Sequence, residues 1–180
     1  KVAIVTGAGS GIGAATALRM LREGASVVAG DIAAEGLEQL RTDAGDAADR
    51  LVTVVGDISA QADVDALVAA AIGRHGRVDI VANVAGIMDW FLPAHEVDDA
   101  TWRKVMAVNL DGPMMLTRAV LPGMQERKGG AFVNVASVGG IRGGAAGAAY
   151  TASKHGLVGL TRNVAWTYAE DGIRCNVVCP

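Results

Sequence analysis

Thr6-Gly7-Ala8-Gly9-Ser10-Gly11-Ile12-Gly13 is the stretch that decides the fold of this chain. It follows the apolar run Val2-Ala3-Ile4-Val5 and precedes a helical pattern over residues 14–21. A strand, a glycine-rich turn and a helix start together present backbone N–H groups to a phosphate. Glycine lets the backbone approach a pyrophosphate closely, and the helix N-terminus adds a partial positive charge. The stretch therefore predicts a phosphate-binding turn, with a tight turn that needs glycine only for packing as the alternative.

Apolar, strand-like runs alternate with helical patterns along the whole chain. The predicted strands cover residues 1–6, 26–31, 51–56, 78–83, 131–137 and 173–179. The predicted helices cover residues 11–23, 34–44, 60–75, 98–125 and 149–170. Strands rich in Val, Ile and Ala with helices between them indicate a parallel sheet buried on both faces, and right-handed crossovers make it doubly wound. We expect a single α/β domain of the Rossmann type over residues 1–180, with strand order 3-2-1-4-5-6 and ligands bound where the order reverses.

Composition narrows the classes of function. The 180 residues suit one well-buried domain, and the formal net charge of -3 is spread without a basic face, which argues against nucleic acid as a partner. No apolar run is long enough to span a membrane and no signal peptide opens the chain, so we expect no membrane association and a cytoplasmic location. Because Lys1 already lies inside a strand pattern, we expect a natural start upstream of it.

Cys175 and Cys179 are the only cysteines. Four residues apart on a predicted strand, they would lie roughly 13 Å apart, beyond the reach of a disulfide. No histidine or acidic cluster accompanies them, so we predict no metal site. We interpret both as small buried hydrophobic residues in a reducing compartment.

Two acidic residues end predicted strands beside the glycine turn, whose glycines fit both Gly7-x-x-x-Gly11-x-Gly13 and Gly9-x-Gly11-x-x-Ala14. Asp31 at the end of the second strand could accept hydrogen bonds from the adenosine ribose and would repel a 2′-phosphate. Neither Ile32 nor Ser10 supplies a cation that would offset this repulsion, which favours NAD over NADP. A helix N-cap is the alternative for Asp31. Asp57 at the end of the third strand could contact adenine or cap the following helix.

Four motifs lie in order along most of the chain: Thr6-Gly-x-x-x-Gly-x-Gly13, Asn83-x-Ala-Gly86, Ser137 and Tyr150-x-x-x-Lys154. In this order and spacing they resemble the short-chain dehydrogenase/reductase family, single-domain oxidoreductases that use NAD or NADP. One departure is Val84, where the family often has a second asparagine. Small residues after Asn83 would leave room for a ribose, and Asn83 itself could tie neighbouring strand ends together.

The chemistry of Tyr150 and Lys154 depends on their spacing, which places both side chains on one face of a helix. A phenol is a poor base near neutral pH, but a cation about 4 Å away contributes on the order of 4 kcal/mol toward its ionised form at an effective dielectric near 20. Tyr150 could therefore act as a general acid/base. Ser137 could hold the substrate oxygen or simply cap the strand end. A helix-surface pair is the alternative for Tyr150 and Lys154.

The resemblance implies an oxidoreductase that interconverts a secondary alcohol and a ketone with NAD(H). It also implies that Asn109 completes the set of Ser137, Tyr150 and Lys154 by holding a water that relays protons; a helix bend accommodated by the asparagine side chain is the alternative. Together with the arguments above it predicts cofactor contacts from Gly7, Ser10, Gly11, Ile12, Gly13, Asp31, Ile32, Asp57, Ile58, Asn83, Ala85, Gly86, Tyr150, Lys154 and Pro180.

The substrate is less visible in the sequence. Residues 87–92 could wall an apolar pocket or pack a loop onto the core, and Arg142 could bind an anion or remain a solvated loop cation. By resemblance, a substrate lid and a last strand would follow Pro180, and the protein would form a homo-oligomer, a dimer or tetramer. A non-catalytic NAD-binding regulator or scaffold of the same fold is the alternative function.

Overall fold

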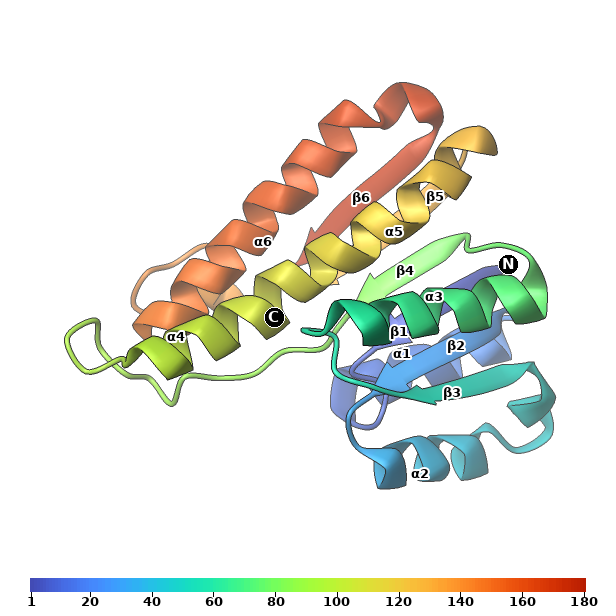
Figure 1. The fold of residues 1–180 in the computed structure, drawn as a ribbon, viewed down its shortest axis with the longest axis horizontal. Helices are drawn as coiled ribbons and strands as arrows, with labels where there is room; N and C mark the ends of the chain where they lie inside the picture. The colour runs from blue at the N-terminus through green and yellow to red at the C-terminus, as the bar shows by residue number, and fades with distance from the viewer.

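The computed structural model describes residues 1–180 and contains one parallel sheet of six strands (Figure 1). The strands are β1 (Val2–Thr6), β2 (Ser26–Asp31), β3 (Leu51–Val55), β4 (Ile80–Asn83), β5 (Gly130–Val135) and β6 (Ile173–Val178). Their order is β3-β2-β1-β4-β5-β6, which confirms the predicted topology. Since β1 pairs with both β2 and β4, the order reverses between β1 and β4.

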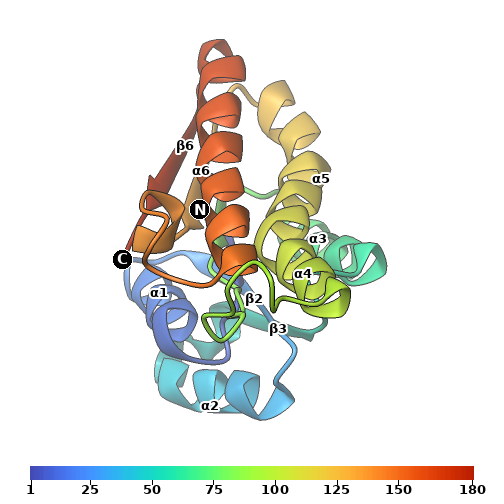
Figure 2. The ribbon, with the colours of Figure 1, turned by 90° about the vertical axis from the view of Figure 1, so that its left-hand side faces the viewer.

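Helices cover both faces of the sheet, as Figures 1 and 2 show from two directions. They are α1 (Gly11–Arg22), α2 (Ala34–Ala44), α3 (Gln61–His75), α4 (Asp99–Met106), α5 (Gly112–Glu126) and α6 (Ala148–Thr167). Short 3₁₀ turns occupy Gly45–Arg50, Val138–Gly140 and Ala169–Asp171.

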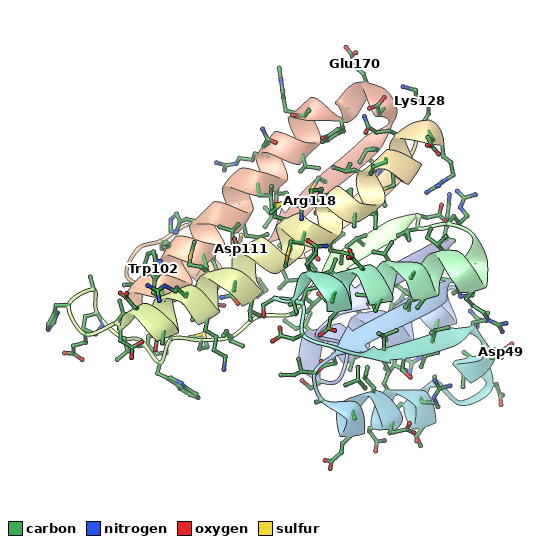
Figure 3. The ribbon with its side chains drawn as sticks, in the orientation of Figure 1. Asp49, Trp102, Asp111, Arg118, Lys128 and Glu170 are labelled. Carbon is green, nitrogen blue, oxygen red and sulfur yellow. The ribbon has the colours of Figure 1, made fainter.

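Neighbouring side chains of β1 point into two separate cores, as a strand buried on both faces requires. Ile4 packs in a core with Leu67 of α3 and Leu116 of α5, whereas Val5 packs with Leu21 of α1 and Leu37 of α2. Helices α3 and α5 are also joined by a hydrogen bond that the Arg118 side chain donates to Gln61 Oε1 at 2.7 Å. Figure 3 labels Arg118 on α5.

Two predicted elements need correction. The predicted helix over residues 98–125 is interrupted by a π-turn at Ala107–Asp111, which separates α4 from α5. The predicted strand 131–137 is β5, which ends at Val135, so Ser137 lies beyond the strand rather than at its end. The other strands and helices differ from prediction by at most three residues at an end.

Candidate active site

A cleft of about 610 Å³ opens at the carboxyl ends of the strands, where the strand order reverses. Open α/β sheets bind their ligands in this position. The cleft is lined by nearly all of the predicted site residues: Gly7, Ser10, Gly11, Ile12, Gly13, Asp31, Ile32, Asp57, Ile58, Ala85, Gly86, Ser137, Tyr150, Lys154 and Pro180. The two predicted residues that do not line it are Asn83 and Asn109, which lie behind its walls.

In the glycine turn, Gly7 and Gly13 are closely packed against neighbouring backbone, whereas Gly11 is open to the cleft. A Cβ on Gly7 would lie 2.8 Å from the Ala85 backbone, and a Cβ on Gly13 would overlap the Gly7 carbonyl group. Gly7 and Gly13 are therefore required for close packing. Gly11, in contrast, has a φ of +49° and lines the cleft, and a Cβ added to it would meet no atom within 4 Å. No side chain caps the start of α1, so its first N–H groups remain available to a phosphate.

Asp31 is bound to the glycine turn rather than capping α2. Its Oδ2 accepts a hydrogen bond from Gly9 N at 2.8 Å, and its Oδ1 accepts one from Ala33 N at 2.9 Å. The N-cap of α2 is Ala33, so the predicted alternative of a helix cap does not describe Asp31. The carboxylate is held at the cleft beside Ile32, whose side chain is 70% exposed.

Asp57 likewise lines the cleft without capping a helix, because the N-cap of α3 is Ala60. Its Oδ1 accepts hydrogen bonds from the Ser59 hydroxyl at 2.7 Å and from Ser59 N at 2.9 Å. These two bonds hold the pKa of the Asp57 carboxyl below its ordinary value. The carboxylate thus stays ionised at this end of the cleft.

Tyr150 and Lys154 share the wall of the cleft that α6 provides. The Lys154 ammonium lies 5.6 Å from the centre of the Tyr150 ring and donates a hydrogen bond to Val135 O at 2.9 Å. The lysine is 3% exposed, and this burial lowers its pKa to about 8, while Cys179 acts in the opposite direction. A cation at this position stabilises negative charge that develops on a neighbouring phenol.

Ser137 begins the 3₁₀ turn that follows β5. Its Oγ accepts a hydrogen bond from Gly139 N at 3.2 Å, so the serine does act as a cap, of the turn rather than of the strand. The same side chain lines the cleft together with Tyr150. Because the cap uses the oxygen as an acceptor, the hydroxyl hydrogen is free to be donated to a ligand.

Asn109 lies in the π-turn, completely buried, and its amide joins two segments of the site. Its Oδ1 accepts from Ile87 N at 2.8 Å, while Nδ2 donates to Ile87 O at 2.9 Å and to Ser153 Oγ at 3.1 Å. Gly86 leaves the space between Asn109 and Lys154 open, since a Cβ there would lie 3.3 Å from Asn109 Oδ1 and 3.2 Å from Lys154 Nζ. The side chain thus bonds to the loop and α6, not to its own helix.

Asn83 ties neighbouring strands together in the interior. Its Nδ2 donates to Asn134 Oδ1 at 2.8 Å, and Asn134 Nδ2 donates to Thr161 Oγ1 at 2.8 Å. The expected link between strand ends is therefore present, but the amide of Asn83 does not face the cleft.

Three further side chains that shape the cleft were not singled out by sequence reasoning. Thr6 Oγ1 accepts hydrogen bonds from Val84 N at 3.1 Å and Ala85 N at 3.3 Å, which joins the ends of β1 and β4. Ser153 Oγ receives the bond from Asn109, and Asp89 binds the start of α6. Thr6 could have been found from the sequence, because it is part of the glycine-turn motif. Ser153 and Asp89 could not, because these hydrogen bonds join them to residues distant in sequence.

The loop after β4 lines the cleft, as one of the two predicted roles held, but its aromatic residues do not pack onto the core. Ile87 and Met88 line the cleft, whereas Trp90 is 85% exposed and Phe91 is also exposed. A second, adjoining hollow of about 480 Å³ lies between this loop and α4. Arg142 is exposed and does not line the cleft, as expected for a solvated loop cation.

No helix combines the length and the apolar character that crossing a bilayer requires. The structure contains no group of three or more His, Cys, Asp or Glu side chains arranged to hold a metal ion.

The doubly wound parallel sheet, with a glycine turn at its switch point and a Tyr–Lys pair on the opposite wall, has the architecture of Rossmann-type dinucleotide-binding proteins. The sequence profile of the family described as short chain dehydrogenase matches residues 1–180. The chain belongs to the short-chain dehydrogenase/reductase family.

Individual relatives agree with this assignment. The chain is 44% identical to 3beta-hydroxysteroid dehydrogenase 2 of Eggerthella lenta over 100% of its own length and 70% of that protein. It is 48% identical to the short-chain dehydrogenase/reductase cdmF of Talaromyces verruculosus, over 99% of this chain and 68% of that protein.

Among solved structures, levodione reductase superposes with a TM-score of 0.95 at 42% identity, over 100% of this chain and 70% of that one. A variant of actinorhodin polyketide ketoreductase, described with NADPH, gives a TM-score of 0.94 at 39% identity, over 100% of this chain and 69% of that one. The chain is therefore an oxidoreductase of a family that acts on CH–OH or carbonyl groups with a nicotinamide dinucleotide.

Proposed function

We propose that the protein interconverts a secondary alcohol and a ketone with NAD(H), and that Tyr150 is the general acid/base. The observation that carries the proposal is that Ser137, Tyr150 and Lys154 line the same cleft as the glycine turn. A module that only binds a nucleotide does not need these three side chains opposite its phosphate-binding turn. This arrangement favours catalysis over the alternative of a regulator or scaffold.

The residues of the cleft fit a nicotinamide dinucleotide. The uncapped start of α1 and the open face of Gly11 suit a pyrophosphate, and Asp31 suits ribose hydroxyl groups. Asp57 and Ile58, which also line the cleft, would contact the adenine, and Lys154 and Pro180 would contact the nicotinamide half of the cofactor. The dinucleotide, when bound, supplies the hydride acceptor for alcohol oxidation and the hydride donor for ketone reduction.

The protein's own residues would manage the proton. In the oxidation direction, ionised Tyr150 accepts the proton of the substrate hydroxyl as the carbon-bound hydrogen leaves as hydride; in reduction the phenol returns the proton. Ser137 donates its free hydroxyl hydrogen to the substrate oxygen and stabilises its developing charge. Lys154 stabilises the phenolate, and Asn109, joined to α6 through Ser153, supports a proton relay behind it.

Tyr150→Phe tests the proposal directly. Phenylalanine keeps the ring but removes the proton-transferring oxygen, so we expect at least about a 100-fold loss of turnover with nearly unchanged NAD binding. Turnover would be followed as NADH formation with a panel of secondary alcohols that includes a 3β-hydroxysteroid, because one relative is named for that substrate. The matched control is Tyr168→Phe, at the only other tyrosine, which lies outside the cleft. Normal turnover by Tyr150→Phe would refute the mechanism.

We also propose a cytoplasmic homo-oligomer. A large aromatic side chain is exposed outside the cleft: Trp166, near the C-terminal end of α6, is 88% exposed and does not line the cleft. Exposed aromatic residues are enriched at interfaces between subunits. Sedimentation equilibrium would measure the mass, and a monomer at micromolar concentration would contradict the assembly.

A further inference from the structure

Asp89 is a buried carboxylate to which the proposed mechanism gives no role. It lies in the loop between β4 and α4, has no exposed surface, and forms no ion pair with any lysine, arginine or histidine. A buried carboxylate without a cation is costly unless hydrogen bonds satisfy it. Its hydrogen-bond partners therefore indicate what it does.

The principal partner of Asp89 is the backbone of the proposed catalytic tyrosine. Asp89 Oδ2 accepts a hydrogen bond from Tyr150 N at 2.9 Å, and Oδ1 accepts one from Phe91 N at 3.3 Å. Helix α6 starts at Ala148, after an N-cap glycine, Gly147, that has no side chain to offer. Tyr150 is thus the third residue of the helix, whose N–H group a capping side chain usually binds. Asp89 supplies this cap from a different segment, and the positive end of the helix dipole stabilises its charge.

Gly147 fits this arrangement. A Cβ on Gly147 would lie 2.5 Å from Asp89 Cγ, closer than side chains approach in real structures. The glycine N-cap therefore makes room for the carboxylate. A second hydrogen bond, from Ala148 N to Leu92 O at 2.9 Å, holds the same loop against the same helix start.

The loop that carries Asp89 is strained and also forms a wall of the cleft. Trp90 and Phe91 have φ angles of 55° and 62°, in the left-handed region that side-chain-bearing residues rarely adopt. The bonds from Phe91 N and Tyr150 N to Asp89 hold the loop in this shape. Met88, directly before Asp89, lines the cleft. One carboxylate thus connects the wall that would face the substrate with the first turn of α6. Figures 1 and 2 show the backbone of the loop before α4 beside the beginning of α6.

We propose that Asp89 is a positioning residue that fixes the first turn of α6, and with it Tyr150, against the Met88 wall of the cleft. The inference rests on the proposed function of Tyr150. Without this bond the helix start would shift or fray, and the phenol would lose its alignment with the substrate oxygen. A misplacement of about 1 Å can cost about 100-fold in rate.

Asp89→Ala, Asp89→Asn and Gly147→Ala test the inference. We expect Asp89→Ala and Gly147→Ala to lower kcat by about 10- to 100-fold, with NAD affinity within about twofold of the original protein. Asp89→Asn keeps an acceptor oxygen and should recover most of the rate. Asp98→Asn is the matched control for the cap, because Asp98 accepts from Thr101 N at 2.6 Å at the exposed start of α4. Gly144→Ala is the control for the glycine, since a Cβ there meets nothing within 4 Å.

Two measurements separate positioning from a purely structural role. In the Asp89→Ala protein, rates per NAD-titrated site should fall and the primary deuterium isotope effect on kcat should rise, because the chemical step becomes slower. Hydrogen exchange at the Tyr150 amide, followed by mass spectrometry without substrate, should accelerate in Asp89→Ala and not in Asp98→Asn. An unchanged rate per site, with only a lower melting temperature, would overturn the inference.

The outcomes also distinguish this inference from the proposed function. If Tyr150→Phe abolishes turnover but Asp89→Ala has normal kcat and normal amide exchange, only the role of Asp89 fails. If Tyr150→Phe retains turnover, the proposed mechanism fails; faster amide exchange in Asp89→Ala would then still show the contact but would not give it a role in catalysis.

Discussion

Asp31 is the residue at which NAD and NADP would be distinguished. Both oxygens of its carboxylate are fixed by backbone N–H groups, at 2.8 Å from Gly9 N and 2.9 Å from Ala33 N, so the charge cannot swing away from an added phosphate. We expect tighter binding of NADH than of NADPH, and we expect Asp31→Ala combined with Ile32→Arg to weaken or reverse this preference. Titration of both reduced cofactors by nucleotide fluorescence measures it.

The control for this prediction is Asp31→Asn, which keeps an acceptor for Gly9 N while removing the charge. It separates loss of charge from loss of the turn's shape. Stronger binding of NADPH by the unmodified protein would contradict the prediction. A solved relative is described with NADPH, so the measurement is informative.

Because Lys154 is buried, we expect an unusual dependence of the free energy of unfolding on pH. Burial lowers its pKa from 10.5 to about 8 in the folded protein. Between these values the unfolded chain holds the proton and the folded protein releases it, so the free energy of unfolding rises with pH. The contribution reaches about 3 kcal/mol across the window. Urea unfolding at about pH 8 and pH 10 should show this rise as the difference between the original protein and Lys154→Met.

The pH dependence has to be compared between the original protein and Lys154→Met, because Cys175 makes the free energy of unfolding fall as pH rises. Burial raises the pKa of its thiol from 9.0 to about 11, against a hydrogen bond with Thr161, so stability contributed by the neutral thiol is lost as pH rises through that range. Both proteins contain Cys175, and its effect cancels. Lys128→Met, at an exposed lysine, is the matched control. The same pH dependence in Lys154→Met would count against a depressed lysine pKa.

For single residues, the sequence indicates the candidate catalytic side chains better than it indicates the contacts that hold them in place. Tyr150 and Lys154 are four residues apart, and helical geometry alone places them together. Asp89 binds the backbone of Tyr150 across 61 residues, a contact with no local pattern to reveal it. The capping alternatives for Asp31 and Asp57 failed because each carboxylate lies before the N-cap and binds other backbone groups instead.

Among the elements, the π-turn between α4 and α5 is the feature that the sequence concealed. Residues 98–125 show continuous helical periodicity, and an extra residue in one turn does not disturb a pattern of apolar positions enough to be seen. The turn places Asn109 so that its amide satisfies both the N–H and the C=O of Ile87. π-Turns within α-helices occur frequently at functional sites.

Asn109→Ala should therefore destabilise the loop as well as the helix. It would leave Ile87 N and Ile87 O without their partner, and we expect a loss of about 2–3 kcal/mol in the free energy of unfolding. Urea denaturation measures the loss, and faster amide exchange confined to residues 86–92 would locate it. Asn176→Ala provides the comparison, because Asn176 is exposed on β6. A change below about 0.5 kcal/mol would mean that water replaces the amide without cost.

On the scale of the whole molecule, the two ends of the sheet have different roles. The amino ends are held by structural charges: burial would raise the pKa of Asp79, but hydrogen bonds from Val2 N and Arg77 lower it overall. At the same end Lys128, which Figure 3 labels, pairs with Asp171, and neither residue lines the cleft. The carboxyl ends instead carry the glycine turn and the candidate catalytic residues.

The strand order was predictable because parallel strands and right-handed crossovers allow few topologies. The shapes of the loops were not predictable, because they depend on contacts between residues distant in sequence.

Thr6 is the side chain that joins the two halves of the sheet at their junction. β1 belongs to one mononucleotide-binding half and β4 to the other, and the Thr6 hydroxyl accepts hydrogen bonds from Val84 N at 3.1 Å and Ala85 N at 3.3 Å. A dinucleotide would lie across this junction. We expect Thr6→Val to weaken NAD binding by about 10-fold, because two partly buried N–H groups lose their acceptor and the cleft widens.

Thr6→Ser keeps the hydroxyl and should retain nearly normal affinity, which separates the hydrogen bonds from the γ-methyl group. Thr53→Val is the matched control, because the Thr53 hydroxyl on outer strand β3 accepts from Arg41 at 3.0 Å and lies outside the cleft. Calorimetric titration with NAD compares all four proteins, and urea unfolding reports how much of any change is a loss of stability. If Thr6→Val binds NAD as tightly as the original protein, the junction is held by the paired strands alone. The hydroxyl would then have no part in shaping the cleft.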